Sequence, residues 1–257
     1  MLLCFSSCPN DTFVFHALLH NRVDTEGLSF DTQIADIQQL NDIAIAGKGD
    51  VVKMSFAVYP EAQQHYEILD SGSALGYGNG PLLVARQTSQ TIDGTTRIAI
   101  PGVHTTAALL MRRAFPQAQN YVPMLFSHIP SAVETGEVEA GVLIHESRFT
   151  YAQQGLCLVA DLGAWWEAHY HLPIPLGGIG IRRTLPVEQQ RSFARVLRRS
   201  VDYALQNPKE SAAFVQHYAQ ELSREVREQH IKMFVNNYTQ SLGTEGRKAI
   251  QLIIDNV

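Results

Sequence analysis

The feature that most constrains the fold of this 257-residue chain is an alternation of short apolar runs with segments of helical periodicity. The runs typical of strands are residues 2–5, 28–34, 51–54, 66–69, 82–85, 98–100, 140–144 and 156–160. Between them, apolar residues recur at helical spacing in residues 11–20, 37–46, 106–115 and 129–135. This alternation predicts an α/β architecture with largely parallel sheets.

The pattern changes after Arg183, where the strand-like runs stop. Four consecutive helices are predicted at residues 186–205, 208–221, 224–238 and 245–257. Pro208 is expected at a helix start, where its fixed φ is favourable. Ser223 is followed at the third position by Val226 rather than by Glu or Gln, so a full capping box is missing there. The last third of the chain is therefore predicted to be helical.

The chain has two candidate crossings between domains. One is the run 82–86 leading into QTSQTIDGT, and the other is PIPLGGIGIRR at 173–183. If both belong to one hinge, residues 1–86 and 176–257 form a discontinuous first lobe, and residues 87–175 form an inserted α/β second lobe. Two lobes joined in this way predict a ligand cleft between them, where small-molecule sites are common.

Composition narrows the function classes. The net charge of −5 argues against nucleic-acid binding, which needs clustered Lys and Arg. No stretch approaches the roughly 20 apolar residues that a membrane span needs. The N-terminal MLLCFSSCPNDTF lacks a basic region and a long apolar region, so it does not resemble a secretory signal. The cysteines, Cys4, Cys8 and Cys157, are odd in number and suit a reducing compartment. We therefore expect a cytoplasmic protein without nucleic-acid or membrane partners.

His145 is the first candidate functional residue. It directly follows the apolar run 140–144, and ligands of open α/β sheets bind at the carboxyl ends of strands. The segment HESRF lacks the second histidine of the zinc motif H-E-x-x-H, so a zinc-protease interpretation fails. A histidine that only ends the strand and bonds a backbone carbonyl explains the pattern equally simply. On the residues alone, that structural interpretation is favoured.

Three more polar turns follow predicted strands, in SCPND, KMS and HTTA. Asp11 lies near a predicted helix start, where it either caps the helix or helps form an anion site. Lys53 and Ser55 end another strand, where they either contact a ligand or lie at the rim and cap the next helix. Thr106 lies near the start of a further helix, with capping again the alternative. Together with His145, these turns could converge on one cleft.

The glycines of SGSALGYGNGP at 71–81 do not predict a dinucleotide site. A dinucleotide loop opens a helix, whereas this one leads through Pro81 into another predicted strand. We predict a tight backbone passage there, which glycine favours because it has no Cβ.

Several long blocks together resemble a known family. SCPNDTFVFHAL, DIQQLNDIAIAGKGDVVKMS, SGSALGYGNGPLLVAR, PGVHTTA, GEVEAGVLIHESRFTY and DLGAWWE are similar to the 1,4-dihydroxy-6-naphthoate synthases of the futalosine route to menaquinone. The resemblance implies a two-lobed type II periplasmic-binding-protein-like fold with a central cleft. It also implies a lyase that converts cyclic dehypoxanthinyl futalosine to 1,4-dihydroxy-6-naphthoate and releases a dihydroxyacetone-like three-carbon fragment. No metal or organic cofactor is implied.

The resemblance also implies roles for single residues. His145 matches the proposed proton acceptor, that is, the general base. The implied substrate contacts are Lys53, Met54, Ser55, Thr106, Ala107 and Asp11. One departure is Ser7, where the family pattern has proline before the cysteine. This change alters the turn but removes no functional group.

Two other functions are compatible with the sequence. Chorismate dehydratase shares the fold and the pathway, although HESRFTY favours the synthase. A solute-binding protein for a small carboxylate would need a signal peptide or a lipid anchor, and neither is visible. The expected partner is a small-molecule substrate, and the sequence leaves a homodimer open.

Overall fold

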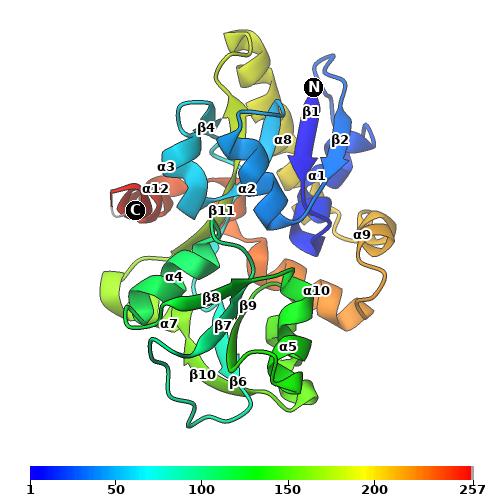
Figure 1. Cartoon of the computed structure of the whole chain (residues 1–257). Helices are drawn as coiled ribbons and strands as arrows, with labels where there is room; N and C mark the ends of the chain where they lie inside the picture. The colour runs from blue at the N-terminus through cyan, green and yellow to red at the C-terminus, as the bar shows by residue number, and fades with distance from the viewer. Residues whose placement is uncertain (256–257) are drawn as a thin grey trace. The chain divides into compact units, whose positions relative to one another are not determined.

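A computed structural model describes residues 1–255, and its internal contacts divide the chain into two units (Figure 1). One unit comprises Met1–Gly76 with Pro175–Val257, and the other comprises Tyr77–Ile174. The first break falls earlier than the sequence-based boundary at residue 86. The reason is that β6 (Leu82–Ala85) forms an antiparallel ladder inside the sheet of the second unit.

The sheet of the first unit has six strands, in the order β2-β1-β3-β11-β4 with β5 paired to β11. The strands are β1 (Leu2–Phe5), β2 (Asp31–Ile34), β3 (Val51–Ser55), β4 (Tyr66–Ile68), β5 (Ala74–Gly76) and β11 (Ile174–Arg182). β1 runs parallel to β2 and β3, whereas β11 is antiparallel to β3 and β4. The sheet is therefore mixed, which corrects the prediction of largely parallel sheets.

β11 was missed as a strand because of its glycines, which weaken strand propensity. Each of these glycines lies against a neighbouring chain segment. A Cβ on Gly177 would lie 2.7 Å from the Met54 carbonyl oxygen, and one on Gly178 would lie 2.7 Å from the Phe56 ring. The glycines that make residues 173–183 resemble a hinge in the sequence are thus the residues that allow β11 to pack closely against its neighbours.

Helices cover the sheet of the first unit. They are α1 (Pro9–Leu19), α2 (Ile37–Ile45), α3 (Tyr59–Ala62), α8 (Val187–Gln206), α9 (Ala212–Tyr218), α10 (Arg224–Phe234), α11 (Asn237–Gln240), α12 (Gly243–Ile254) and the 3₁₀ turn Phe56–Val58. α8 packs against α1 and presents Phe193, Val196, Leu197 and Val201 at helical spacing to the core. On the sheet side, Phe5 and its strand neighbours complete this core.

Three of the predicted C-terminal helices differ from the structure. α9 begins at Ala212 rather than at Pro208, because the Ser211 hydroxyl donates to the Pro208 carbonyl within a preceding turn. The helix predicted at 224–238 ends at Phe234, and Asn236 then caps the separate α11. The last predicted helix, 245–257, begins earlier, at Gly243, and its residues 256–257 lie outside the described residues.

The second unit contains a five-stranded sheet in the order β10-β6-β9-β7-β8. Besides β6, its strands are β7 (Arg97–Ile100), β8 (Asn120–Pro123), β9 (Ala140–Leu143) and β10 (Cys157–Asp161). Its helices are α4 (Thr106–Ala114), α5 (Ile129–Thr135), α6 (Ser147–Thr150), α7 (Leu162–Tyr170) and the 3₁₀ turns Phe126–His128 and Tyr151–Gln154. β7 is parallel to β8 and β9, whereas β6 is antiparallel to β9 and β10.

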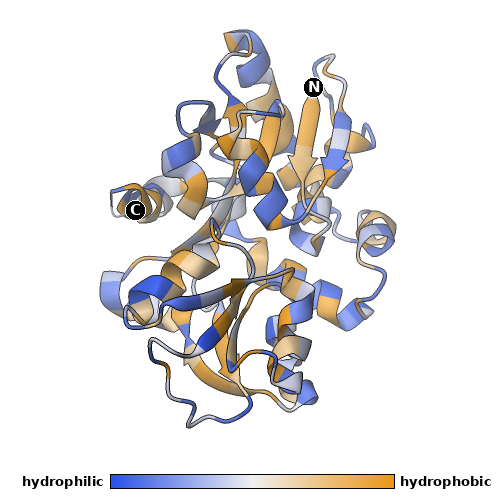
Figure 2. Cartoon of the chain, in the orientation of Figure 1, coloured by the Kyte–Doolittle hydropathy of each residue, from blue (hydrophilic) through white to orange (hydrophobic). Residues whose placement is uncertain are grey.

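The strands differ in hydropathy according to their place in the sheet. Figure 2 shows β1 as mostly hydrophobic and its neighbour β2 as mostly polar. β1 is paired on both sides and largely buried, whereas β2 forms an edge of the sheet and is mostly exposed. An edge strand made of polar residues is a common protection against pairing with other chains.

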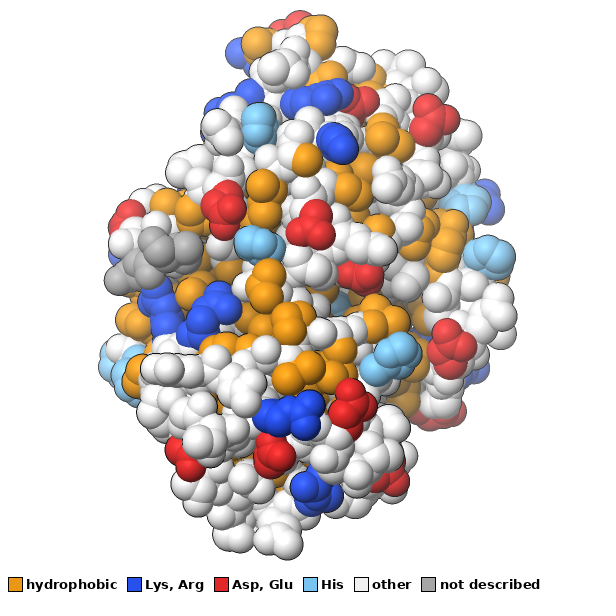
Figure 3. Space-filling view, viewed as in Figure 1, with side chains coloured by type: hydrophobic (Ala, Val, Ile, Leu, Met, Phe, Trp, Pro, Cys, Tyr) orange, Lys and Arg blue, Asp and Glu red, His pale blue; other side chains and the backbone are white. Residues whose placement is uncertain are grey.

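The surface carries charges of both signs. On the face drawn in Figure 3, Lys and Arg side chains are interspersed with Asp and Glu side chains. Within residues 1–255, no helix is long and apolar enough to cross a membrane.

Candidate functional site

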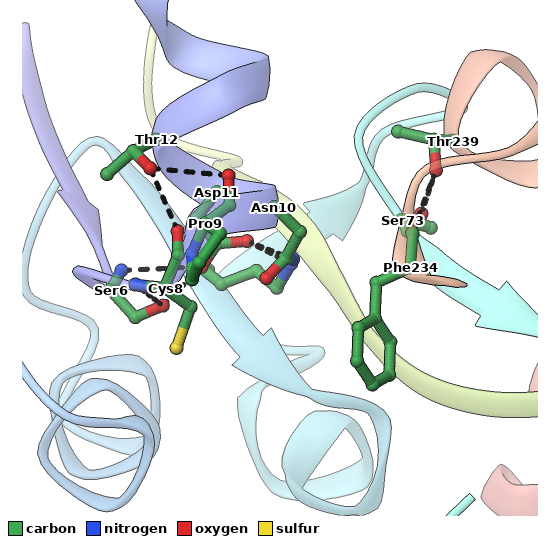
Figure 4. A network of polar contacts seen from close by, with 10 residues as sticks. Ser6, Cys8, Pro9, Asn10, Asp11, Thr12, Ser73, Phe234 and Thr239 are labelled. Carbon is green, nitrogen blue, oxygen red and sulfur yellow. Dashed lines mark hydrogen bonds and ion pairs between the residues drawn. The ribbon is translucent and has the colours of Figure 1, made fainter. Parts of the chain in front are cut away.

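A buried polar cluster lies where β1 leads into α1 in the first unit (Figure 4). The Asp11 carboxylate is its centre. Oδ1 of Asp11 accepts from Nζ of Lys53 at 2.6 Å and from Nδ2 of Asn10 at 2.8 Å. Oδ2 accepts from the Ser6 hydroxyl at 2.7 Å and more weakly from the Ser6 amide at 3.4 Å. The carboxylate is thus held by a cation and neutral donors together, which makes its hydrogen bonds strong.

This geometry corrects two sequence-based alternatives. Asp11 is not the N-cap, because α1 begins at Pro9 with Cys8 in the cap position. Lys53 does not lie at a rim either, since both it and Asp11 are buried in the first unit. Neither Ser6 nor Asn10 is recognisable as a site residue from the sequence, where their place in the same polar turn is the available signal.

Ser55, the last residue of β3, is held by the side chain of Asn41 on α2. The Ser55 amide donates to Oδ1 of Asn41 at 2.8 Å, and Nδ2 of Asn41 donates to the Ser55 hydroxyl oxygen at 3.1 Å. Both residues are buried. Ser55 makes no side-chain capping bond to the following 3₁₀ turn, so the capping alternative is wrong. Asn41 was not singled out in the sequence.

Met54 points its side chain into the core of the first unit, where it packs among residues such as Leu40 and Tyr66. A substrate contact from Met54 stays a prediction, and it would have to come from the backbone.

In the second unit, several strand ends meet at one edge of the sheet. β7, β8 and β9 are mutually parallel, so the turns that follow them lie at the same edge. β6 is antiparallel to β9, with Leu82 opposite Leu143, so the segment that enters β6 also lies there. This is the edge at which α/β sheets bind ligands.

His145 lies at this edge, in the turn directly after β9. The prediction that it ends a buried strand is therefore confirmed. Its backbone φ is +53°, in the left-handed region that non-glycine residues adopt at a cost of about 1–3 kcal/mol. The half-buried imidazole packs edge to face on Phe126, with ring centroids 5.0 Å apart. A strained backbone that delivers a titratable ring to a strand end is typical of functional sites.

The N-terminus of α4 lies at the same edge of the second unit. Thr105 caps this helix: its hydroxyl oxygen accepts from the Ala108 amide at 3.2 Å and its hydroxyl donates to the Gly102 carbonyl at 2.8 Å. The helix start predicted at Thr105–Thr106 is thus confirmed. Thr106 and Ala107 form the buried first turn of α4, where the dipole of the helix favours a negative ligand.

The glycine-rich segment before β6 is a tight backbone passage, as predicted. A Cβ on Gly80 would lie 2.3 Å from Cα of Gly163, at the start of α7. Next to it, Nη2 of Arg148 donates to the Gly78 carbonyl at 3.1 Å. Burial lowers the pKa of the Arg148 guanidinium, and the nearby Asp161 opposes this shift.

The two α/β units, each with a mixed sheet and covering helices, define a periplasmic-binding-protein-like fold. The alkanesulfonate-binding protein SsuA from Xanthomonas axonopodis pv. citri has this fold, with a TM-score of 0.73 at 16% identity over 99% of this chain and 91% of that chain. A crystal structure of a protein from Archaeoglobus fulgidus is much more similar, with a TM-score of 0.94 at 37% identity over 99% of this chain and 95% of that chain.

Sequence relatives narrow the class further. The model of the menaquinone biosynthesis family matches residues 1–256. A protein of Thermus thermophilus named 1,4-dihydroxy-6-naphthoate synthase is 45% identical, over 96% of this chain and 90% of the relative. A Streptomyces coelicolor protein of the same name is 41% identical, over 97% and 89%. The chain belongs to the menaquinone biosynthesis family.

Within residues 1–255, no group of three or more His, Cys, Asp or Glu side chains is placed to hold a metal ion. The expectation that no metal or organic cofactor takes part stays a prediction.

Proposed function

We propose that this protein is a 1,4-dihydroxy-6-naphthoate synthase, a carbon–carbon lyase. Its substrate is cyclic dehypoxanthinyl futalosine, and its products are 1,4-dihydroxy-6-naphthoate and a dihydroxyacetone-like three-carbon fragment. The relatives of that name support this proposal over nearly the full chain. The observation that carries it is the strained His145 at the carboxyl end of β9.

We assign His145 the role of general base. Release of the sugar-derived carbons and aromatisation of the remaining ring require the removal of a proton from a weakly acidic carbon. A neutral imidazole accepts a proton near pH 7, and such a base typically contributes about 10²–10⁴-fold to the rate. The gain of aromaticity then favours the product side. Packing on Phe126 orients the imidazole, so little freedom is lost when the substrate binds.

Thr106 and Ala107 are proposed to bind the substrate through the first turn of α4. Because β7 and β9 are parallel, the first turn of α4 lies at the same edge of the sheet as His145. The proposed donors, Thr106 and Ala107, and the proposed base, His145, thus belong to neighbouring turns of one unit. The helix N-terminus favours oxygen atoms that carry negative charge. These groups would stabilise charge that develops on an oxygen as the proton leaves carbon.

In the first unit, Ser55, Lys53 and Asp11 are the proposed contacts. The Ser55 hydroxyl oxygen accepts a hydrogen bond from the side-chain amide of Asn41. The hydroxyl proton therefore remains available for donation to the substrate. Lys53 is already neutralised by Asp11, so the pair offers oriented hydrogen-bonding groups rather than a net charge.

The experiment is incubation of the purified protein with cyclic dehypoxanthinyl futalosine, followed by mass-spectrometric detection of both products. His145→Asn should lower turnover by about 10²-fold or more, because asparagine tolerates the left-handed backbone but cannot act as the base. The matched control is His171→Asn, since His171 is also left-handed, belongs to the same unit and is exposed at the end of α7.

The control should keep wild-type turnover. Near-wild-type turnover in His145→Asn would remove His145 as the base. Conversion of chorismate instead of the futalosine derivative would assign the protein to the dehydratase, and tight ligand binding without turnover would indicate a solute-binding protein.

A further inference from the structure

The side-chain amide of Asn79, in the second unit, has no role in the site described above. Its side chain is only 2% exposed, yet neither Oδ1 nor Nδ2 has a hydrogen-bond partner among residues 1–255. Most buried side-chain polar atoms in native proteins are paired, because an unpaired one loses its hydration without compensation. A buried amide whose Nδ2 lacks an acceptor is therefore poised to donate to a bound ligand.

The backbone around Asn79 is fixed from several sides. The Gly78 amide donates to Oε1 of Glu167 at 2.6 Å, and the Gly78 carbonyl accepts from Nη2 of Arg148. On the other side, Gly80 lies directly against Gly163. Because its neighbours are held in this way, Asn79 cannot easily turn to find a protein partner. The unpaired amide is thus built into the fold.

Arg148 adds a charge to the same place. Its Nη2 is bonded to the residue next to Asn79, whereas its Nη1 is buried and has no partner within the described chain. Asp161, whose charge opposes the lowering of the Arg148 pKa, uses Oδ1 to cap α7 through the amides of Gly163 and Ala164. The unpaired guanidinium N–H of Arg148, which is anchored at the neighbouring Gly78, and the unpaired carboxamide N–H of Asn79 are donors suited to a carboxylate.

The position of this pair relates it to His145. Asn79 precedes β6 by three residues, and Leu82 at the start of β6 lies opposite Leu143 at the end of β9. His145 follows two residues after Leu143, and Arg148 lies on the short helix α6 that comes next. The three side chains therefore arise from one edge of one sheet.

We propose that Asn79 and Arg148 form the subsite for the aryl carboxylate of the substrate. This inference rests on the proposed function, whose product carries its carboxylate on the ring distant from the two hydroxyl groups. Arg148 neutralises the carboxylate, and Asn79 donates to it through Nδ2. Holding the non-reacting ring at this point fixes which carbon faces His145, so Asn79 and Arg148 act as positioning residues.

The test compares two probes by isothermal titration calorimetry: 1,4-dihydroxy-6-naphthoate and its neutral 6-carboxamide. The wild type should prefer the carboxylate by about 10–100-fold. Asn79→Leu keeps the size of the side chain and removes both polar ends, and Arg148→Gln removes the charge. Arg148→Gln should lower naphthoate affinity at least about tenfold while changing carboxamide affinity much less, whereas Asn79→Leu should lower the affinity for both probes. With the futalosine substrate, Asn79→Leu should mainly raise KM.

The control is Asn120→Leu, because Asn120 is an exposed asparagine at the opposite end of the parallel strands, where β8 begins. It should bind both probes as the wild type does. Unchanged naphthoate affinity in Asn79→Leu would overturn the proposal, whatever the melting temperature of the variant. An unchanged ratio of the two affinities in Arg148→Gln would overturn it as well.

The result can be separated from the proposed function. If the wild type converts the futalosine derivative but neither Asn79→Leu nor Arg148→Gln lowers naphthoate affinity, only the subsite is wrong. If the wild type converts no substrate, the synthase proposal fails, and titration with benzoate and 2-naphthoate still decides whether this pair binds aryl carboxylates.

Discussion

The ammonium group of Lys53 lies 2.6 Å from Oδ1 of Asp11, and both side chains are buried in the first unit. The pair joins the first turn of α1 to the strand β3. Removing one partner leaves an uncompensated buried charge, which costs far more than the intact pair contributes.

We predict that Lys53→Met or Asp11→Asn lowers the free energy of unfolding by about 3–5 kcal/mol, measured by urea denaturation. The double variant Lys53→Met/Asp11→Asn should lose less than the sum of the single variants. As a control, Arg191→Met breaks an exposed pair with Glu188 and should change stability by less than about 1 kcal/mol. Strict additivity of the two buried substitutions would contradict the pairing.

A second prediction concerns Asn41 as a positioning residue for Ser55. Asn41→Asp keeps the acceptor for the Ser55 amide but loses the donor to the Ser55 hydroxyl, whereas Asn41→Leu loses both. We expect Asn41→Leu to cost about 1–3 kcal/mol of stability because the Ser55 amide is left unpaired. KM should rise in both variants. If Asn41→Leu raises KM equally in the Ser55→Ala background, Asn41 does not act through Ser55.

Stability should depend on the protonation of His16. Burial lowers its pKa from 6.5, the nearby His20 and Arg22 lower it further, and Glu210 opposes them. The unfolded chain therefore binds a proton at a pH where the folded chain does not. The stabilisation is complete above pH 6.5 and is lost as the pH falls through 6.5 toward the folded-state value.

The measurement is urea denaturation at several pH values between 5 and 8. His16→Phe should flatten the pH dependence in this range, because phenylalanine fills the space and does not titrate. His217→Phe alters an exposed histidine near the same helices and should leave the slope of the wild type. If the free energy of unfolding of His16→Phe depends on pH as steeply as that of the wild type, the pH dependence comes from other groups.

The close approach of Gly80 to Gly163 gives a fourth prediction. Gly80→Ala places a methyl group 2.3 Å from the Gly163 Cα, and backbone atoms cannot move aside as a flexible side chain can. We expect a loss of at least about 1–3 kcal/mol in stability and weaker naphthoate binding. Gly94→Ala is the control, since its new methyl group would meet only the Gln117 carbonyl oxygen at an ordinary 3.4 Å. Thermal unfolding of the two variants side by side decides the point.

Much of the local structure could be predicted because local patterns determine it. The bounds of β1, β6 and α5 agree with the prediction, and the start of α4 lies where Thr105 can cap it. Periodicity and capping act between residues that are close in the chain. β5, β8 and β11 were missed, since short polar or glycine-containing strands show no such pattern and depend on their neighbours in the sheet.

The candidate site was predicted in part for the same reason. That His145 ends a strand is visible in the sequence, but its left-handed backbone and its contact with Phe126 are not. Lys53 and Asp11 were each noticed, yet nothing local indicated that they pair. Asn79 carried no signal, because only its surroundings leave its amide unpaired.

The sequence by itself determined the α/β alternation, the helical last third and the strand ends that carry His145, Ser55 and Thr106. Hydrophobic periodicity encodes these features, because each strand or helix must present an apolar face to a core. Only the tertiary structure decided that β11 runs antiparallel between β3 and β4, that Lys53 meets Asp11, and that Asn79 is buried beside Arg148. Strand order and burial arise from contacts between residues far apart in the chain.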